Sequence, residues 1–196
     1  MKKVLILDFG GQYNLLIARR VRQSGVFCEI KSYRTPLAEI KAFSPDAVIL
    51  TGGPATVFDE GAPTIDKSVF EMGVPVLGIC YGMQLMVYTL GGDCRKADKR
   101  EYGKVLLNHV PSPLFKDVPD TSVCWMSHGV EVDSLPEGFK TTATSDYCGF
   151  CAVENEEKKL YGVQFHPEVV HTEYGTKILE NFLFEVCGLE KEWKMS

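Results

Sequence analysis

The chain has 196 residues, of which 45% are hydrophobic and 24% charged, and its formal net charge is −5. This length and composition fit one domain with a substantial core. The negative charge and the lack of any basic run argue against nucleic acid as a direct partner. Lys2 and Lys3 lead straight into a short strand-like run, so we expect neither a signal peptide nor a membrane span. The seven scattered cysteines then indicate free thiols in a reducing cytoplasm rather than a disulfide framework.

The first half of the chain alternates between short apolar runs and amphipathic segments. Lys3–Asp8 is a continuous apolar run that ends in a carboxylate, which is typical of a parallel strand buried on both faces. The expected strands are Lys3–Asp8, Phe27–Tyr33, Asp46–Thr51 and Val76–Ile79, and the expected helices are Gln12–Gln23, Leu37–Phe43, Ile65–Met72 and Met83–Leu90. This order predicts an α/β fold with a doubly wound, mostly parallel sheet and helices on both faces. In such sheets, function gathers at the carboxyl ends of the strands.

From Asp93 onward the pattern changes to short alternating segments, which predict a small antiparallel extension of the same domain. The expected strands are Lys104–His109, Val123–Met126, Lys140–Ser145, Gly149–Glu154 and Leu160–Phe165, with a polar turn at Asn155–Lys159. A closing helix is expected over Thr172–Val186, where apolar residues share one face, and Gly188 follows it as a stop signal. The sequence therefore predicts a single domain over residues 1–188.

The most informative stretch is Gly78-Ile79-Cys80-Tyr81-Gly82, between an apolar run and helix-forming residues. It has the form G-x-nucleophile-x-G, the sharp strand-to-helix turn that exposes an attacking side chain in hydrolases. A helix amino terminus also favours the anionic thiolate of Cys80. The alternative is that Cys80 is a small buried hydrophobic residue at a strand end. The two flanking glycines favour the nucleophile.

A thiolate nucleophile needs a proton-transferring partner and a group that orients it. His166 follows an expected strand, and the rigid Pro167 separates it from Glu168, so Cys80, His166 and Glu168 form a candidate triad. On spacing alone, a catalytic role for His166-Pro167-Glu168 and an ordinary loop after a strand are equally well supported. The N–H groups of Gly53 and Tyr81 are the candidate donors to an oxyanion, although Gly52-Gly53-Pro54 taken alone reads as a plain turn.

Three shorter patterns are set aside. Asp8-Phe9-Gly10 matches a kinase metal-binding tripeptide, but no catalytic-loop H-R-D accompanies it. Cys148-Gly149-Phe150-Cys151 is a C-x-x-C, but two further zinc ligands at matching spacing are not apparent, nor is the helix that a redox site needs. Gly10-Gly11 does not complete a dinucleotide fingerprint. We therefore expect no metal or cofactor in this chain.

Together, the segments around Gly52-Gly53-Pro54, Cys80 and His166-Pro167-Glu168 resemble the class I, triad-type glutamine amidotransferases over nearly the whole chain. The resemblance is most specific for the glutaminase part of GMP synthases. It extends there to Ile6–Tyr13, Lys99–Gly103, Trp125–Gly129 and His166–Thr172.

The resemblance implies roles for individual residues. Cys80 would attack the side-chain amide of glutamine, His166 would transfer protons, and Glu168 would orient His166. Gly53 and Tyr81 would donate to the oxyanion. The residues implied to hold the amino-acid end of the substrate are Gln84, Ser127, His128, Gly129 and Val130. Val130 departs from the family pattern, which usually has Asp there, and this puts coupling to a partner in question.

The resemblance also implies a partner: an ATP-dependent synthetase domain or subunit that aminates XMP. The chain has no phosphate-binding loop, so ATP and Mg²⁺ are expected only in that partner. Residues 189–196 resemble the start of a linker to it. Two alternatives stay open: an amidotransferase domain for a different acceptor, and a non-catalytic module on the same fold.

Overall fold

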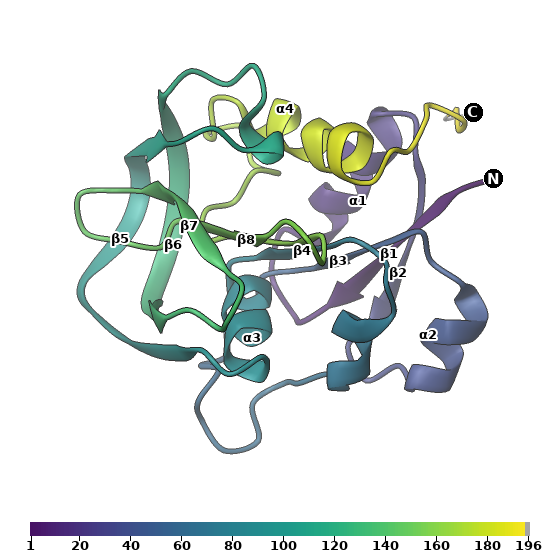
Figure 1. Ribbon diagram of the computed structural model, residues 1–196, viewed down its shortest axis with the longest axis horizontal. Helices are drawn as coiled ribbons and strands as arrows, with labels where there is room; N and C mark the ends of the chain where they lie inside the picture. The colour runs from purple at the N-terminus through teal and green to yellow at the C-terminus, as the bar shows by residue number, and fades with distance from the viewer. Residues whose placement is uncertain (195–196) are drawn as a thin grey trace.

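A twisted sheet crosses the whole molecule and divides its helices into two layers (Figure 1). The computed structural model describes residues 1–194. Within that range the sheet has nine strands in the order β2-β1-β3-β4-β9-β8-β7-β5-β6. The parallel part comprises β1 (Lys3–Asp8), β2 (Phe27–Ser32), β3 (Ala47–Leu50), β4 (Val76–Ile79) and β9 (Leu160–Val163). The predicted α/β fold with a mostly parallel core is confirmed.

Apolar runs form the centre of this sheet because both of its faces are covered. Every residue of β3, β4 and β9 is buried, as expected for central parallel strands. One face carries α1 (Asn14–Gln23), α4 (Gly175–Glu180) and the π-helical turn η3 (Asn181–Val186). The other carries α2 (Leu37–Phe43), the 3₁₀ turn η1 (Lys67–Glu71) and α3 (Tyr81–Thr89). The two layers fix the position of every loop at the carboxyl ends of the strands.

The antiparallel part is larger than predicted. It comprises β5 (Asp93–His109), β6 (Thr121–Ser134), β7 (Lys140–Thr144) and β8 (Ala152–Asn155), with the 3₁₀ turn η2 (Pro113–Phe115) after β5. β5 and β6 are 17 and 14 residues long, whereas the sequence predicted strands of six and four residues. The charged run around Lys99 looked unlike a strand because most of its side chains are exposed. A register shift between Lys96 and Glu101 lets the pairing continue past it.

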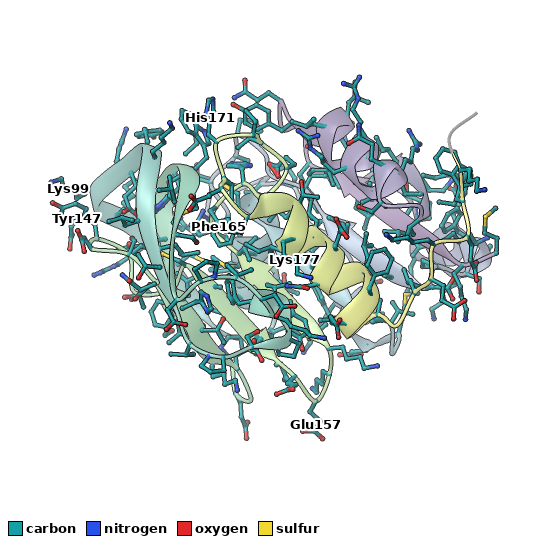
Figure 2. All side chains as sticks on the ribbon, turned by 90° about the horizontal axis from the view of Figure 1, so that it is seen from above. Lys99, Tyr147, Glu157, Phe165, His171 and Lys177 are labelled. Atoms are coloured by element: carbon teal, nitrogen blue, oxygen red, sulfur yellow. The ribbon has the colours of Figure 1, made fainter. Side chains whose placement is uncertain are left out.

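Other predicted elements differ in detail. Leu160–Phe165 was expected in the antiparallel extension, but β9 pairs in parallel with β4 and so joins the main sheet. The expected helix Ile65–Met72 is only the five-residue turn η1. The closing helix is split, because the hydrogen-bond pattern widens to a π-helix at Asn181. The polar turn at Asn155–Lys159 is present, and Figure 2 shows Glu157 pointing outward from it.

Residues that were expected to begin a linker pack back onto the domain. Leu189 is buried in the core, and the N–H of Trp193 donates to the carbonyl of Gly25 at 2.9 Å. Met195 and Ser196, the end of that expected linker, lie outside the described residues. No helix in residues 1–194 has both the length and the apolar character needed to span a bilayer.

Candidate active site

Cys80 occupies the sharp turn between β4 and α3. Its φ of 53° and ψ of −109° lie in a region that residues with side chains rarely adopt. The flanking glycines are required sterically: a Cβ on Gly78 would lie 2.6 Å from the carbonyl oxygen of Gly82. A Cβ on Gly82 would lie 2.4 Å from the carbonyl oxygen of Leu50. The G-x-C-x-G pattern therefore marks a strained turn that is held in place by the packing of α3 against β3.

The thiol of Cys80 faces a polar pocket rather than the core. Its Sγ donates toward the carbonyl oxygen of Ser127 at 3.8 Å, and Nε2 of Gln164 donates to Sγ at 3.4 Å. The backbone N–H of Cys80 is bonded to Val163 on β9 at 2.8 Å. The parallel pairing of β4 with β9 thus brings the loop after β9 directly beside the nucleophile.

His166 and Glu168 lie in that loop and form a tight buried pair. Nδ1 of His166 lies 2.5 Å from Oε1 of Glu168, and the Glu168 side chain is fully buried. Oε2 of Glu168 has no hydrogen-bond partner among residues 1–194. Arg20 on α1 donates from Nε to the Glu168 carbonyl oxygen at 3.1 Å, and the Tyr13 ring packs edge-on against His166. The carboxylate is therefore aimed at one ring nitrogen, which leaves the other for the thiol.

The backbone at His166 is fixed from β6. Its N–H donates to the carbonyl oxygen of Trp125 at 3.0 Å. Thr172 bridges the same two segments: its hydroxyl donates to the His166 carbonyl oxygen at 2.6 Å and accepts the Trp125 N–H at 3.0 Å. This clamp determines where the imidazole lies relative to Cys80.

The pKa of His166 shows that its charged form is favoured in this site. Burial by itself lowers the pKa, but hydrogen bonds to Cys80 and Glu168 and the negative charges of both groups raise it from 6.5 to about 10. An imidazolium next to a thiolate is the activated state of a cysteine nucleophile.

The two residues proposed as oxyanion donors, Gly53 and Tyr81, both line the cavity at Cys80. A Cβ on Gly53 would lie 2.4 Å from the carbonyl oxygen of Phe9, so the loop after β3 lies close against the loop after β1. Gly52 lies next to both His166 and Cys80. A Cβ at this position would be 3.2 Å from Cε1 of His166 and 3.6 Å from Cβ of Cys80. Tyr81 is the first residue of α3, where backbone N–H groups lack helical partners.

A cavity of about 520 Å³ opens over the thiol, and its lining includes all ten residues predicted for the site. Gln84 and His128, however, turn their nitrogen atoms to the protein. Nε2 of Gln84 donates to Val130 O and to Gln164 Oε1, both at 3.0 Å. The two ring nitrogens of His128 contact Val130 O and Glu101 Oε1, both at 3.1 Å. In this structure these two side chains support the Ser127–Val130 segment of β6 through the Val130 carbonyl oxygen.

Sequence reasoning missed three residues of this site, two that line the cavity and one that contacts the thiol. Lys96 and Arg100 on β5 bring positive charge to it, but the charged run that contains them was not recognised as strand. Gln164 contacts the thiol directly. Its position at the end of a predicted strand, two residues before His166, was the available signal.

Comparison with known proteins agrees with this geometry. The family model described as glutamine amidotransferase class-I matches residues 5–186. The chain belongs to the class-I glutamine amidotransferases. Its curated relatives include proteins named GMP synthase [glutamine-hydrolyzing] from Caldicellulosiruptor saccharolyticus and Acetivibrio thermocellus, 56% and 55% identical over 98% of this chain. The chain spans 38% of the length of each of these relatives.

Solved structures of other amidotransferases share the fold. A protein described as a putative GMP synthase subunit, from Thermoplasma acidophilum, is 30% identical, with a TM-score of 0.87 over 96% of this chain and 94% of that one. A glutamine amidotransferase from Thermotoga maritima is 19% identical, with a TM-score of 0.75 over 96% and 99% of the two chains. The likeness to the second protein establishes the fold alone.

Proposed function

We propose that this amidotransferase chain hydrolyses glutamine to glutamate and ammonia with Cys80, His166 and Glu168 as its triad. The observation that carries the proposal is that Cys80, on a strained turn, lines the same cavity as the buried histidine–glutamate pair. Each member comes from a loop at the carboxyl end of a parallel strand, where such sheets place their chemistry.

The acylation step follows from this geometry. The Cys80 thiolate attacks the side-chain amide carbon of glutamine, and the carbonyl oxygen becomes an oxyanion that the N–H groups of Gly53 and Tyr81 stabilise. The carbon–nitrogen bond then breaks while His166 protonates the departing nitrogen. The products of this step are ammonia and a thioester between the glutamyl group and Cys80.

Deacylation reverses the proton flow. Neutral His166 takes a proton from water, the resulting hydroxide attacks the thioester carbon, and the carbon–sulfur bond breaks to release glutamate and the thiolate. The proton remaining on His166 restores the ion pair with Cys80. Glu168 stabilises the imidazolium in both half-reactions through its bond to Nδ1.

Two features of the cavity support glutamine as the substrate. The free amino acid carries a carboxylate, and Lys96 and Arg100 supply cationic groups to the cavity wall. The Ser127–Val130 segment of β6 also lines the cavity, and backbone carbonyl groups are acceptors suited to an ammonium group. Gln84 and His128 hold this segment in place through the Val130 carbonyl oxygen.

We further propose that the ammonia serves an ATP-dependent synthetase domain or subunit that aminates XMP. The likeness to longer proteins named GMP synthase [glutamine-hydrolyzing] supports this assignment. ATP and Mg²⁺ would bind in that partner, and residues after 188 would lead toward it. A reducing cytoplasm would keep the catalytic thiol usable.

Glutamate release from glutamine tests the hydrolysis. We expect Cys80→Ala to abolish it, whereas Cys28→Ala, which removes a buried thiol from β2, should preserve it. Glutamate release that survives Cys80→Ala would refute the proposed chemistry. The assay should be run with and without an isolated XMP-aminating domain. Glutamine-dependent formation of GMP in the mixture supports the acceptor, and amination of another acceptor in its place would overturn it.

A further inference from the structure

Three side chains of metal-binding type meet behind the Ser127–Val130 segment of β6. Glu101 lies on β5, His128 lies opposite it on β6, and Cys148 lies in the loop between β7 and β8. One carboxylate oxygen, one ring nitrogen and the Cys148 sulfur all lie within 4.8 Å of one another, and all three residues are buried. The sequence showed no further ligands for the C-x-x-C that begins at Cys148. The fold brings Glu101 and His128 to its first cysteine.

The orientation of His128 suits a metal ligand. Nδ1 lies 3.1 Å from the Val130 carbonyl oxygen, an acceptor, so this nitrogen carries a proton. Nε2 points instead at Glu101 Oε1, 3.1 Å away. A backbone carbonyl that fixes one ring nitrogen and frees the other toward the ion is the usual support of a metal-bound histidine.

The carboxylate of Glu101 is supported in the same way. The hydroxyl of Ser145 donates to its two oxygens at 3.2 and 2.9 Å. Nε2 of His128 and Oε1 of Glu101 face each other at 3.1 Å, so one ion could contact both atoms.

Cys151 lies beside this cluster, and its Sγ donates to the Cys148 carbonyl oxygen at 3.6 Å. Its sulfur is not among the three donors that lie within 4.8 Å of one another. One sulfur, one imidazole nitrogen and one carboxylate oxygen form a donor set that suits Zn²⁺, whereas Mg²⁺ and Ca²⁺ prefer oxygen ligands.

We propose that Glu101, His128 and Cys148 form a zinc site that ties the Ser127–Val130 segment of β6 to β5 and to the loop between β7 and β8. The loop that carries Cys148 reaches the surface at Tyr147, beside Lys99 (Figure 2), with the Lys99 ammonium 3.9 Å from the Tyr147 ring centre. Opening of this loop provides a route for the ion.

Cobalt titration of the full chain, after treatment with a chelator, tests the proposal. We expect one Co²⁺ per chain with a sulfur-to-cobalt charge-transfer band, displacement of cobalt by Zn²⁺, and a higher melting temperature with zinc. Cys148→Ser should weaken binding at least tenfold. Cys80→Ala and Cys28→Ala should leave the band unchanged.

Two outcomes would overturn the site. One is the absence of any charge-transfer band in the folded wild-type chain at excess cobalt. The other is a band lost in Cys80→Ala and kept in Cys148→Ser, which would assign the metal to the catalytic thiol. Because a cysteine variant could unfold, Glu101→Gln provides a second test that leaves the thiols in place. It should shift the visible cobalt spectrum and weaken cobalt binding. An unchanged spectrum would refute the proposal.

Discussion

Removing the charge of Glu168 is the sharpest test of how the triad is tuned. In the structure, Nδ1 of His166 lies 2.5 Å from the Glu168 carboxylate. Glu168→Gln keeps the shape of this side chain and an oxygen that can accept from Nδ1. It removes the buried negative charge that helps to raise the pKa of His166 to about 10. We therefore expect the His166 pKa to fall and glutamine hydrolysis to slow.

The size of the effect follows from the same pair. A charge-assisted hydrogen bond is about twice as strong as a neutral one, so the substitution forfeits ~1 kcal/mol of imidazolium stabilisation. At ~1.4 kcal/mol per pKa unit, this lowers the His166 pKa by ~0.7 units. The corresponding loss in kcat/KM is ~5-fold.

Proton NMR of the imidazole Cε1–H resonances measures the titration directly, because the chain has only four histidines. Glu154→Gln is a matched control: Glu154 is also buried, with one oxygen bonded to Ser112 and the other without a hydrogen-bond partner in residues 1–194. It should leave the His166 midpoint in place. A His166 midpoint that is unchanged in Glu168→Gln would refute the role given to this carboxylate.

Three further predictions concern the scaffold of the site. Gly82→Ala raises helix propensity, but its Cβ would lie 2.4 Å from the Leu50 carbonyl oxygen, so the free energy of unfolding measured in urea should fall by about 3 kcal/mol. A more stable variant would contradict this. Thr172→Val loses the hydrogen bonds to His166 and Trp125, so the free energy of unfolding should fall by ~2–4 kcal/mol and kcat should fall with it. Thr172→Ser keeps the hydroxyl and should retain activity. Equal kcat values in the two variants would argue against the clamp. The raised His166 pKa contributes stability that is fully present below pH 6.5 and lost as pH rises through about 10. The unfolding free energy of wild type relative to His166→Gln should therefore decline across that window, and a constant difference would count against it.

The triad could be predicted because each member lies where a short pattern meets a strand end. Cys80 follows the buried run of β4, and His166 follows β9 by only a few residues. Parallel strands align their carboxyl ends, so two such ends in one sheet imply proximity even without a known register. The pairing of β4 with β9 was not foreseen, however, since β9 reaches the parallel sheet through a hairpin from β8.

The back of the site could not be predicted, because it depends on pairing across β5 and β6. Glu101 and His128 are opposite each other only because a register shift absorbs the charged run before Glu101. That run is exposed and carries no apolar alternation, so periodicity gives no signal there. Cys148 reaches the pair from a third element, the loop after β7. The β5–β6 pairing, its register shift and the position of the loop after β7 must all be known before these residues can be recognised as one cluster.

The same contacts bear on Val130, where the family pattern usually has Asp. The structure holds this position through its backbone: the Val130 carbonyl oxygen accepts from Gln84 Nε2 at 3.0 Å and lies 3.1 Å from His128 Nδ1. Neither bond uses the Val130 side chain, which packs against the core on the α3 side of the sheet. This segment of β6 can therefore keep its shape with Val at position 130. Val130→Ala keeps both backbone bonds and should leave basal glutamate release within about twofold, whereas Val130→Asp presses a charge against the core and should lower stability in urea unfolding. A large loss of basal activity in Val130→Ala would show that the side chain, and not the backbone, sets the position of this segment.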